Sequence, residues 1–127
     1  MAATDFLAKL AQLLPKDRLY TDPVDCYAYA YDNSRIFHSP LAVAFPIHAE
    51  EVQAVIRLCN AENVPVVPRG RGTGTAGGSV PEVGGVALSL ERMNRILSVD
   101  PDNRMAIVEP GVLNQESQDS IKDVGFF

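Results

Sequence analysis

Residues 66–79 read Val66-Val67-Pro68-Arg69-Gly70-Arg71-Gly72-Thr73-Gly74-Thr75-Ala76-Gly77-Gly78-Ser79 and hold five of the nine glycines in the 127-residue chain. Glycine lacks a Cβ atom, so a ligand can approach its backbone closely and the chain can adopt positive φ angles. Successive main-chain N–H groups in such a loop can converge on an anion. Two arginines add positive charge to a chain whose formal net charge is −5. Residues 70–79, the glycine loop, therefore predict a site for a phosphate-bearing cofactor.

The composition is that of a globular protein, with 46% hydrophobic and 21% charged residues. Its acidic balance argues against a general nucleic-acid surface. Cys26 and Cys59 do not make a disulfide framework, and with only two histidines present no metal-ligand spacing occurs. The N-terminus lacks a secretory pattern, and no apolar run approaches the ~20 residues that cross a bilayer. We expect a cytoplasmic protein, or one held at the inner membrane within a larger complex.

The first forty residues predict a helical arm followed by an irregular segment. Thr4 can cap a helix that ends before Pro15, with a helically spaced apolar face that packs on the rest of the domain. A membrane-surface role is the alternative, although the helix offers a single lysine. Further on, three alternating tyrosines precede a turn at Asp32-Asn33-Ser34, so a short strand and an irregular segment stay open. We interpret the tyrosines, Tyr27, Tyr29 and Tyr31, as packed side chains with hydroxyls at the rim, and ligand contact as the alternative.

Residues 41–67 predict a βαβ unit. Leu41–Phe45 is an apolar strand, and residues 50–62 form a helix whose inner face comprises Val52, Val55, Ile56 and Cys59. Asn63 is a plausible left-handed residue after this helix. A second strand covers residues 64–67. A parallel pair with a right-handed crossover is therefore expected.

Beyond the glycine loop the pattern changes to short strands. Residues 86–90, 96–99 and 105–108 predict three strands, the last two in a hairpin. Asn114 is expected to cap a last helix that ends near Gly125. The final Gly125-Phe126-Phe127 indicates the start of another buried element, and hence a truncated end. The fold class is α+β, with a small mixed sheet, an arm at residues 1–40 and a main unit at residues 41–127.

Three known kinds of glycine-rich segment could explain the loop: a dinucleotide-binding fingerprint, a P-loop or a mobile linker. Gly72–Gly77 fits G-x-G-x-x-G, but the dinucleotide fingerprint needs a helix that begins inside the motif, and Gly78-Ser79-Val80-Pro81 prevents one. The P-loop pattern also nearly fits, but Gly78 occupies the lysine position, which argues against nucleotide triphosphate hydrolysis. A mobile linker is typically rich in Gly and Ser, whereas this segment contains two arginines and lies between two predicted buried strands, which argues against a linker.

The motifs together identify a family resemblance. Pro68-Arg69-Gly70-Arg71-Gly72-Thr73-Gly74 with Gly77-Gly78 resembles the first flavin-binding segment of FAD-linked oxidases of the vanillyl-alcohol oxidase / p-cresol methylhydroxylase type. The flanks agree, namely Val43-Ala44-Phe45-Pro46, Gly85–Leu90, Met93–Leu97 and Val108-Glu109-Pro110-Gly111-Val112. Within this family the chain looks most like the glycolate oxidase FAD subunit and D-lactate dehydrogenases, from about Tyr31 to Gly125.

The resemblance implies the first lobe of an FAD-binding domain and assigns cofactor-binding residues. The pyrophosphate cradle would comprise Pro68, Arg69, Gly70, Arg71, Gly72, Thr73, Gly74, Gly77 and Gly78, and Pro110 and Gly111 would lie near the flavin ring. Arg71 stands where relatives commonly carry a small residue, so its salt bridge to the pyrophosphate is a hypothesis. Relatives that tether FAD covalently here use a histidine, yet His38 and His48 lie outside the loop. We therefore expect non-covalent FAD.

The resemblance also implies the activity of the complete protein. Such an enzyme oxidises a small 2-hydroxy acid, of the glycolate or D-lactate type, by hydride transfer to FAD, and passes electrons to an acceptor or electron-transfer subunit. The second half of the FAD domain and the substrate domain are missing from these 127 residues, so no catalytic residue is assigned. We expect the chain alone to bind FAD weakly and to self-associate through surfaces that the missing half would cover. The alternative is a catalytically inactive interaction module.

Overall fold

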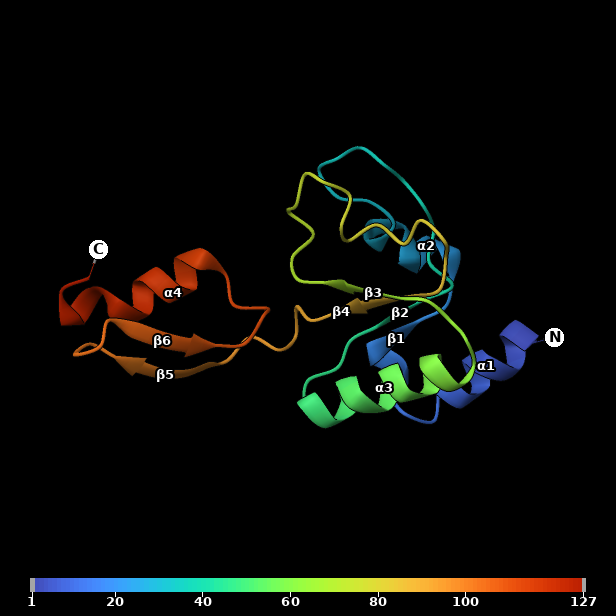
Figure 1. Ribbon diagram of the computed structural model, residues 1–127, viewed down its shortest axis with the longest axis horizontal. Coiled ribbons are helices and arrows are strands. Elements are labelled where there is room, and N and C mark those ends of the chain that lie inside the picture. Colours follow the sequence, from blue (N-terminus) through green and yellow to red (C-terminus); the bar gives the residue numbers. More distant parts are fainter. Residues whose placement is uncertain (1, 127) are drawn as a thin grey trace.

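The computed structural model describes residues 2–126, which form a four-stranded sheet, helices, long loops and a separate hairpin (Figure 1). The helices are α1 (Ala2–Leu10), α2 (Pro23–Cys26), α3 (Ala49–Ala61) and α4 (Asn114–Ile121), with 3-10 turns η1 (Lys16–Arg18), η2 (Tyr27–Tyr29) and η3 (Lys122–Val124). The strands are β1 (Leu19–Tyr20), β2 (Ala42–Ala44), β3 (Val66–Arg69), β4 (Val86–Ser89), β5 (Ile96–Asp100) and β6 (Met105–Val108). The predicted α+β class with a small mixed sheet is confirmed. None of these helices has the length and apolar character to cross a membrane.

The main sheet has the order β1-β2-β4-β3. β4 runs parallel to both of its neighbours, and β1 runs antiparallel to β2. The expected direct pairing of β2 with β3 is therefore wrong, because β4 lies between them. All four residues of β4 are buried, which suits a central strand. β3 lies at the edge, where Pro68 is tolerated because its missing N–H removes no bond from an inner strand.

The two faces of the sheet are covered differently. Alternate residues face α1 and α3 in a core that contains Phe6, Leu10, Leu14, Ala42, Ala44, Val55, Cys59, Val86 and Leu88. The residues between them face a second cluster of Cys26, Val43, Phe45 and Ala87, with Tyr20 and Tyr29 packed against it. This strict alternation follows from the two-residue period of a strand. The sheet is therefore a shared wall between a helical layer and an aromatic layer.

The inner face of α3 differs from the predicted one at a single position. Val55 and Cys59 are buried as expected, but Ile56 is 45% exposed. Leu58 packs against the core in its place. Leu58 lies three residues after Val55, so the two share a helix face, and Ile56 lies on the opposite flank of that face. The predicted left-handed residue is confirmed, since Asn63 has φ 55°.

The N-terminal forty residues are more regular than expected. α1 begins at Ala2, so Thr4 lies inside the helix and is not its cap, and the helix ends at Leu10 rather than next to Pro15. The segment expected to be irregular supplies strand β1 and helical turns α2 and η2. Its link to α3 is a bidentate ion pair, in which Arg18 donates to both carboxylate oxygens of Glu51 at 2.5 and 2.9 Å. The division of the chain at residue 40 stays a prediction.

Tyr29 bears out the reading of the tyrosines as packed residues. Its ring meets Tyr20 and Phe45 edge to face, with centroids 6.2 and 5.1 Å away. Its hydroxyl donates to Glu91 at 2.9 Å. Burial raises the pKa of Tyr29, and the carboxylate of Glu91 raises it further. Tyr27 and Tyr31 are 59% and 42% exposed and contact each other and Phe37, so the predicted packing into the domain applies to Tyr29 alone of the three.

The predicted hairpin of β5 and β6 is confirmed and stands apart from the main sheet (Figure 1). α4 lies beside it, and an open hollow of about 390 Å³ between the hairpin and the end of this helical segment is lined in part by Val99, Met105, Ile121 and Phe126. Asn114 is the first residue of α4, and its cap is Leu113, whose N–H donates to Glu116 at 2.7 Å. α4 ends at Ile121, earlier than expected, and the 3-10 turn η3 continues to Val124, with left-handed Gly125 as its cap. Phe127, part of the predicted apolar terminus, lies outside the described residues.

The inner face of α3 can be tested with two neighbouring residues. Val55→Ala removes fully buried methyl groups and should lower the free energy of unfolding by about 2 kcal/mol. Ile56→Ala removes more atoms from a half-exposed site and should lower it by less than about 1 kcal/mol. Urea denaturation followed by circular dichroism measures both. Equal losses for the two variants would contradict this assignment of the buried face.

Candidate functional site

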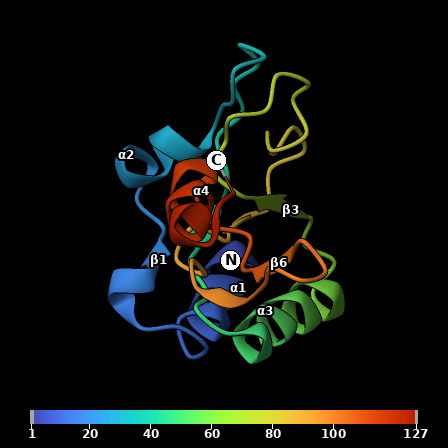
Figure 2. The same cartoon turned by 90° about the vertical axis from the view of Figure 1, so that its left-hand side faces the viewer.

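The glycine loop connects β3 to β4 on the side of the sheet opposite α1 and α3. Figures 1 and 2 both show it beside residues 27–37, here called the tyrosine segment. An open hollow of about 370 Å³ is lined by Asp32, Gly70, Arg71, Gly72, Thr73, Gly74, Thr75, Ala76, Gly78 and Ser79. The loop leaves the carboxyl end of a parallel strand, which is the edge where α/β sheets place their ligands. No helix occurs between residues 70 and 85, which confirms the rejection of the dinucleotide fingerprint and the P-loop.

The main-chain donors of the loop give the hollow its chemistry. Within the described residues, no protein group accepts a hydrogen bond from the N–H groups of residues 72–76. Four of these five residues are exposed, so their N–H groups are open to solvent and to a ligand. A run of five such donors next to a hollow is a site at which an anion can be held by backbone alone.

Arg71 is the one basic side chain among the residues that line the hollow. It is exposed, and its Nε donates to the carbonyl oxygen of Gly111 at 2.9 Å. This bond leaves the two terminal nitrogens of the guanidinium without a protein partner among residues 2–126. Arg71 therefore connects the glycine loop to the turn at residues 110–111 and keeps donors for an anion.

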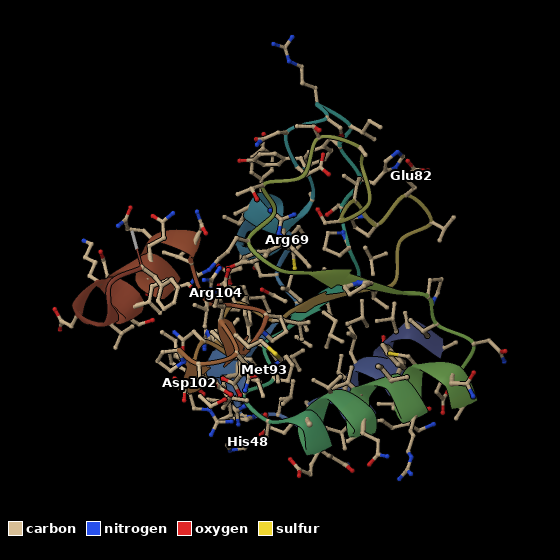
Figure 3. The ribbon with its side chains drawn as sticks, turned by 60° about the vertical axis from the view of Figure 1, so that its left-hand side comes forward. His48, Arg69, Glu82, Met93, Asp102 and Arg104 are labelled. Atoms are coloured by element: carbon tan, nitrogen blue, oxygen red, sulfur yellow. The ribbon has the colours of Figure 1, made fainter. Side chains whose placement is uncertain are left out.

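Arg69, expected in the cradle, has its side chain elsewhere. It is only 8% exposed and does not line the hollow. Its guanidinium donates to the carbonyl oxygens of Tyr31 at 2.7 Å and Ala28 at 3.4 Å, and lies 5.5 Å from the centroid of the Tyr29 ring. Figure 3 shows Arg69 at the base of the loops. The residue anchors the tyrosine segment to the end of β3.

Gly72 lies directly above this guanidinium. Its φ is +67°, and a methyl group at this position would overlap the Arg69 side chain. Both facts favour glycine, because a left-handed conformation strains other residues. The charge of Arg69 consequently lies behind the loop, where it adds positive potential without contacting the hollow.

The turn at Pro110 and Gly111 closes against the same loop. A Cβ atom at Gly70 would lie 3.7 Å from the carbonyl oxygen of Pro110, and one at Gly111 would lie 2.5 Å from the carbonyl oxygen of Glu91. The amide of Gly111 donates to the carbonyl of Met93 at 2.8 Å. The fold thus brings the two predicted parts of the site together, although Pro110 and Gly111 do not line the hollow.

Glu109 holds this turn in place. Its buried carboxylate accepts from the main-chain N–H of Arg95 at 2.8 Å and from the guanidinium of Arg95 at 2.6 and 3.1 Å. These contacts with Arg95 hold the pKa of Glu109 below its ordinary value. The turn therefore keeps its ion pair at neutral pH.

Asp32 is a site residue that the sequence analysis assigned only to a turn. It is 4% exposed and lines the hollow, and its carboxylate accepts from the amide of Gly77 at 3.1 Å and the hydroxyl of Ser79 at 3.4 Å. Hydrogen bonds from Ser34, and to a lesser extent those from Gly77 and Ser79, hold the pKa of Asp32 below its ordinary value. The signal in the sequence was the Asp-Asn-Ser turn itself, but nothing local indicated that it meets residues 45 positions away.

Of the eleven predicted site residues, six line the hollow: Gly70, Arg71, Gly72, Thr73, Gly74 and Gly78. Gly77 contributes through its bond to Asp32, whereas Pro68 and Arg69 belong to β3. The described residues contain no cluster of side chains suited to a metal ion, and Cys26 and Cys59 are both buried free thiols.

Comparison with known proteins agrees with this description. A family model described as "FAD binding domain" matches residues 40–127. The chain is 32% identical to the glycolate oxidase subunit GlcD of Bacillus subtilis, over 100% of this chain and 27% of that protein. It is 39% identical to D-2-hydroxyglutarate dehydrogenase of Xanthomonas citri pv. viticola, over 94% of this chain and 25% of that protein. The chain thus spans about a quarter of the length of the curated relatives that it matches.

A solved structure also matches. The crystal structure of p-cresol methylhydroxylase with substrate bound has a TM-score of 0.84 and 29% sequence identity, over 98% of this chain and 25% of that one. The resemblance inferred from the motifs is therefore confirmed.

The need for glycine at position 72 can be tested against a glycine in the same loop. Gly72→Ala should lower the free energy of unfolding by about 1–3 kcal/mol, because the new residue is strained and displaces the Arg69 guanidinium. Gly78→Ala is the control, since its Cβ would meet no atom within 4 Å. Thermal unfolding followed by circular dichroism measures both. A Gly72→Ala protein as stable as the control would show that this close approach is not needed.

Proposed function

The chain belongs to the FAD binding domain family, and on this premise we propose that the glycine loop binds the pyrophosphate of FAD through its main-chain N–H groups. The observation that carries the proposal is the row of N–H groups at residues 72–76 without a protein acceptor, next to an open hollow. A pyrophosphate presents several acceptor oxygens and two or more negative charges, which such a row of donors can satisfy. The residues present therefore fit this part of the cofactor.

Arg71 supplies the side-chain cation of the proposed site. Its Nε is held by the carbonyl oxygen of Gly111, so the guanidinium is oriented before any ligand arrives. Hydrogen bonds from a guanidinium to phosphate oxygens are charge-assisted and stronger than neutral ones. Arg69 does not take this role, since its own donors are used by the tyrosine segment.

Pro110 and Gly111 are proposed to lie toward the flavin ring. The support is that Gly70 approaches the carbonyl oxygen of Pro110 and Arg71 binds that of Gly111. The turn therefore lies against the glycine loop, next to the hollow that the loop lines. When bound, FAD supplies a ring system that accepts a hydride, and the residues described here bind and orient its phosphates.

The complete protein is proposed to be an FAD-dependent oxidoreductase that acts on a small 2-hydroxy acid. The support lies in the relatives, which are named glycolate oxidase subunit GlcD, D-2-hydroxyglutarate dehydrogenase and D-lactate dehydrogenase. We assign no catalytic residue to these 127 residues. Because the GlcD relatives are named as subunits, an electron-transfer partner is also proposed.

The rival proposal is an interaction module without catalysis. One observation favours it, namely the exposure of Leu97, Met105 and Ile107 on the hairpin. Exposed apolar side chains gathered on one element are typical of contact surfaces. Binding of FAD phosphates at the glycine loop separates the two proposals.

Titration of the isotope-labelled chain with FAD and with inorganic pyrophosphate tests the site. We expect saturable amide shift changes in residues 70–79, even if the affinity of the chain alone is low. Arg71→Ala should weaken binding about tenfold, because a charge-assisted hydrogen bond is lost. Arg57→Ala, an exposed arginine on α3, is the control for net charge. Unchanged affinity in Arg71→Ala would refute the role of Arg71, and the absence of saturable shifts would favour the interaction module.

The linkage of the cofactor is proposed to be non-covalent. Neither histidine lines the hollow, and Figure 3 shows His48 at the start of α3, on the far side of the sheet from the glycine loop. Acid precipitation of the flavin-loaded protein should therefore release all of the flavin to the supernatant. Yellow colour that stays with the washed precipitate would contradict this prediction.

A further inference from the structure

The turn at Asp32, Asn33 and Ser34 contacts the glycine loop at four points. Asp32 accepts from the amide of Gly77 and the hydroxyl of Ser79. Asn33 donates from its main-chain N–H to the carbonyl oxygen of Gly74 at 2.9 Å, and from its side-chain Nδ2 to that of Thr73 at 3.2 Å. Within the turn, Asp32 also accepts from the amide of Ser34 at 2.8 Å. One short turn thus accepts hydrogen bonds from the loop and also donates hydrogen bonds to it.

These contacts determine the direction of two peptide planes. In a planar trans peptide, the C=O of one residue and the N–H of the next point in opposite directions. Because the carbonyls of Thr73 and Gly74 point to Asn33, the N–H groups of Gly74 and Thr75 point away from the turn. Both of these N–H groups belong to the row that has no protein acceptor. Asn33 therefore aims two of the donors on which the proposed site depends.

The turn is itself anchored to the sheet. Tyr31, the residue before Asp32, accepts a hydrogen bond from Arg69 at the end of β3. Arg69 directly precedes the glycine loop. The tyrosine segment therefore forms hydrogen bonds at the beginning of the loop, through Arg69, and at its end, through Gly77 and Ser79. Glycine-rich backbone has many conformations of similar energy, and an external template is needed to select one of them.

We propose that Asp32, together with Asn33, is the positioning residue of the cofactor site, and that it holds the glycine loop in its phosphate-binding conformation before FAD arrives. The inference rests on the proposed function of the loop. It goes beyond it because neither residue needs to contact the cofactor.

Because Asp32 is charged, the inference can be tested by whether removal of the charge strengthens or weakens phosphate binding. A carboxylate that lines an anion site repels a phosphate, so if charge were its main influence, its removal would strengthen binding. If positioning is its main influence, removal weakens binding although the repulsion is gone. The two roles of the same side chain predict opposite changes.

Asp32→Asn is the decisive variant. Its side-chain oxygen can still accept from Ser34, but its NH₂ group replaces the oxygen that accepts from Gly77 and Ser79. We expect the dissociation constant for pyrophosphate to rise about fivefold, since hydrogen bonds that organise the loop are lost. Without ligand, hydrogen exchange of the Gly77 amide should accelerate, while exchange in β4 and the unfolding midpoint stay near those of the wild type. Asp25→Asn, which removes an exposed carboxylate from α2, is the matched control and should change neither quantity.

Tighter or unchanged pyrophosphate binding by Asp32→Asn would overturn the inference, as would unchanged exchange of Gly77. If Asp32→Asn lowers the unfolding midpoint strongly, Asn33→Ala decides, because it removes only the exposed bond to Thr73. That variant should weaken pyrophosphate binding about twofold and speed exchange in residues 73–77. A wild-type chain that shows no saturable binding would refute the proposed function, whereas the exchange of Gly77 in the unliganded variants would still decide whether the turn positions the loop.

Discussion

Every polar group in the backbone of β4 has to be paired inside the sheet, because all four residues of this strand are buried. Parallel strands on both sides, β2 and β3, provide those partners. Parallel pairing also places the carboxyl ends of the three strands at one edge. The glycine loop leaves β3 at this edge, and Glu91, which backs the Gly111 turn, follows β4 there. The position of the candidate site thus follows from the need to pair the backbone hydrogen-bonding groups of one buried strand.

The site itself is ordered from outside the glycine loop. Residues 72–76 make no hydrogen bonds through their N–H groups within the described chain, so the loop does not stabilise itself in the way a helix does. Its shape comes from Arg69 beneath it, from the Asp32 turn on one side and from the turn at Gly111 on the other. The carbonyls of Thr73 and Gly74 accept from Asn33, while the neighbouring N–H groups keep no protein acceptor, which is the polarity that an anion requires. The residues that order the loop and the residues whose N–H groups are free are therefore different ones.

Part of this arrangement was accessible from residue patterns. β2, β3, β4 and the hairpin follow from short apolar runs, and α3 follows from a period of 3.6 residues, both of which local sequence displays directly. The glycine loop was recognised from composition, and the absence of a following helix from Gly78 and Pro81. Ile56 was wrongly placed on the buried face of α3, because the sequence pattern cannot distinguish two apolar residues that flank the true face. Thr4 and Asn114 were wrongly assigned as caps for a related reason, since a suitable side chain near a helix start does not determine the first residue of the helix.

The sequence by itself determined every strand except β1, the helices α1, α3 and α4 in outline, the position of the glycine loop, and the family to which the motifs belong. These properties depend on residues close together in the chain. Only the tertiary structure decided that β4 separates β2 from β3, that Arg69 turns away from the hollow, and that Asp32 meets Gly77. Each of these depends on contacts between residues about 20 to 45 positions apart, where the geometry is set by how the layers pack around the sheet. The local sequence around a charged residue next to glycines is the same whether its side chain faces a ligand or supports the loop. Only the packing of the folded chain distinguishes these two positions.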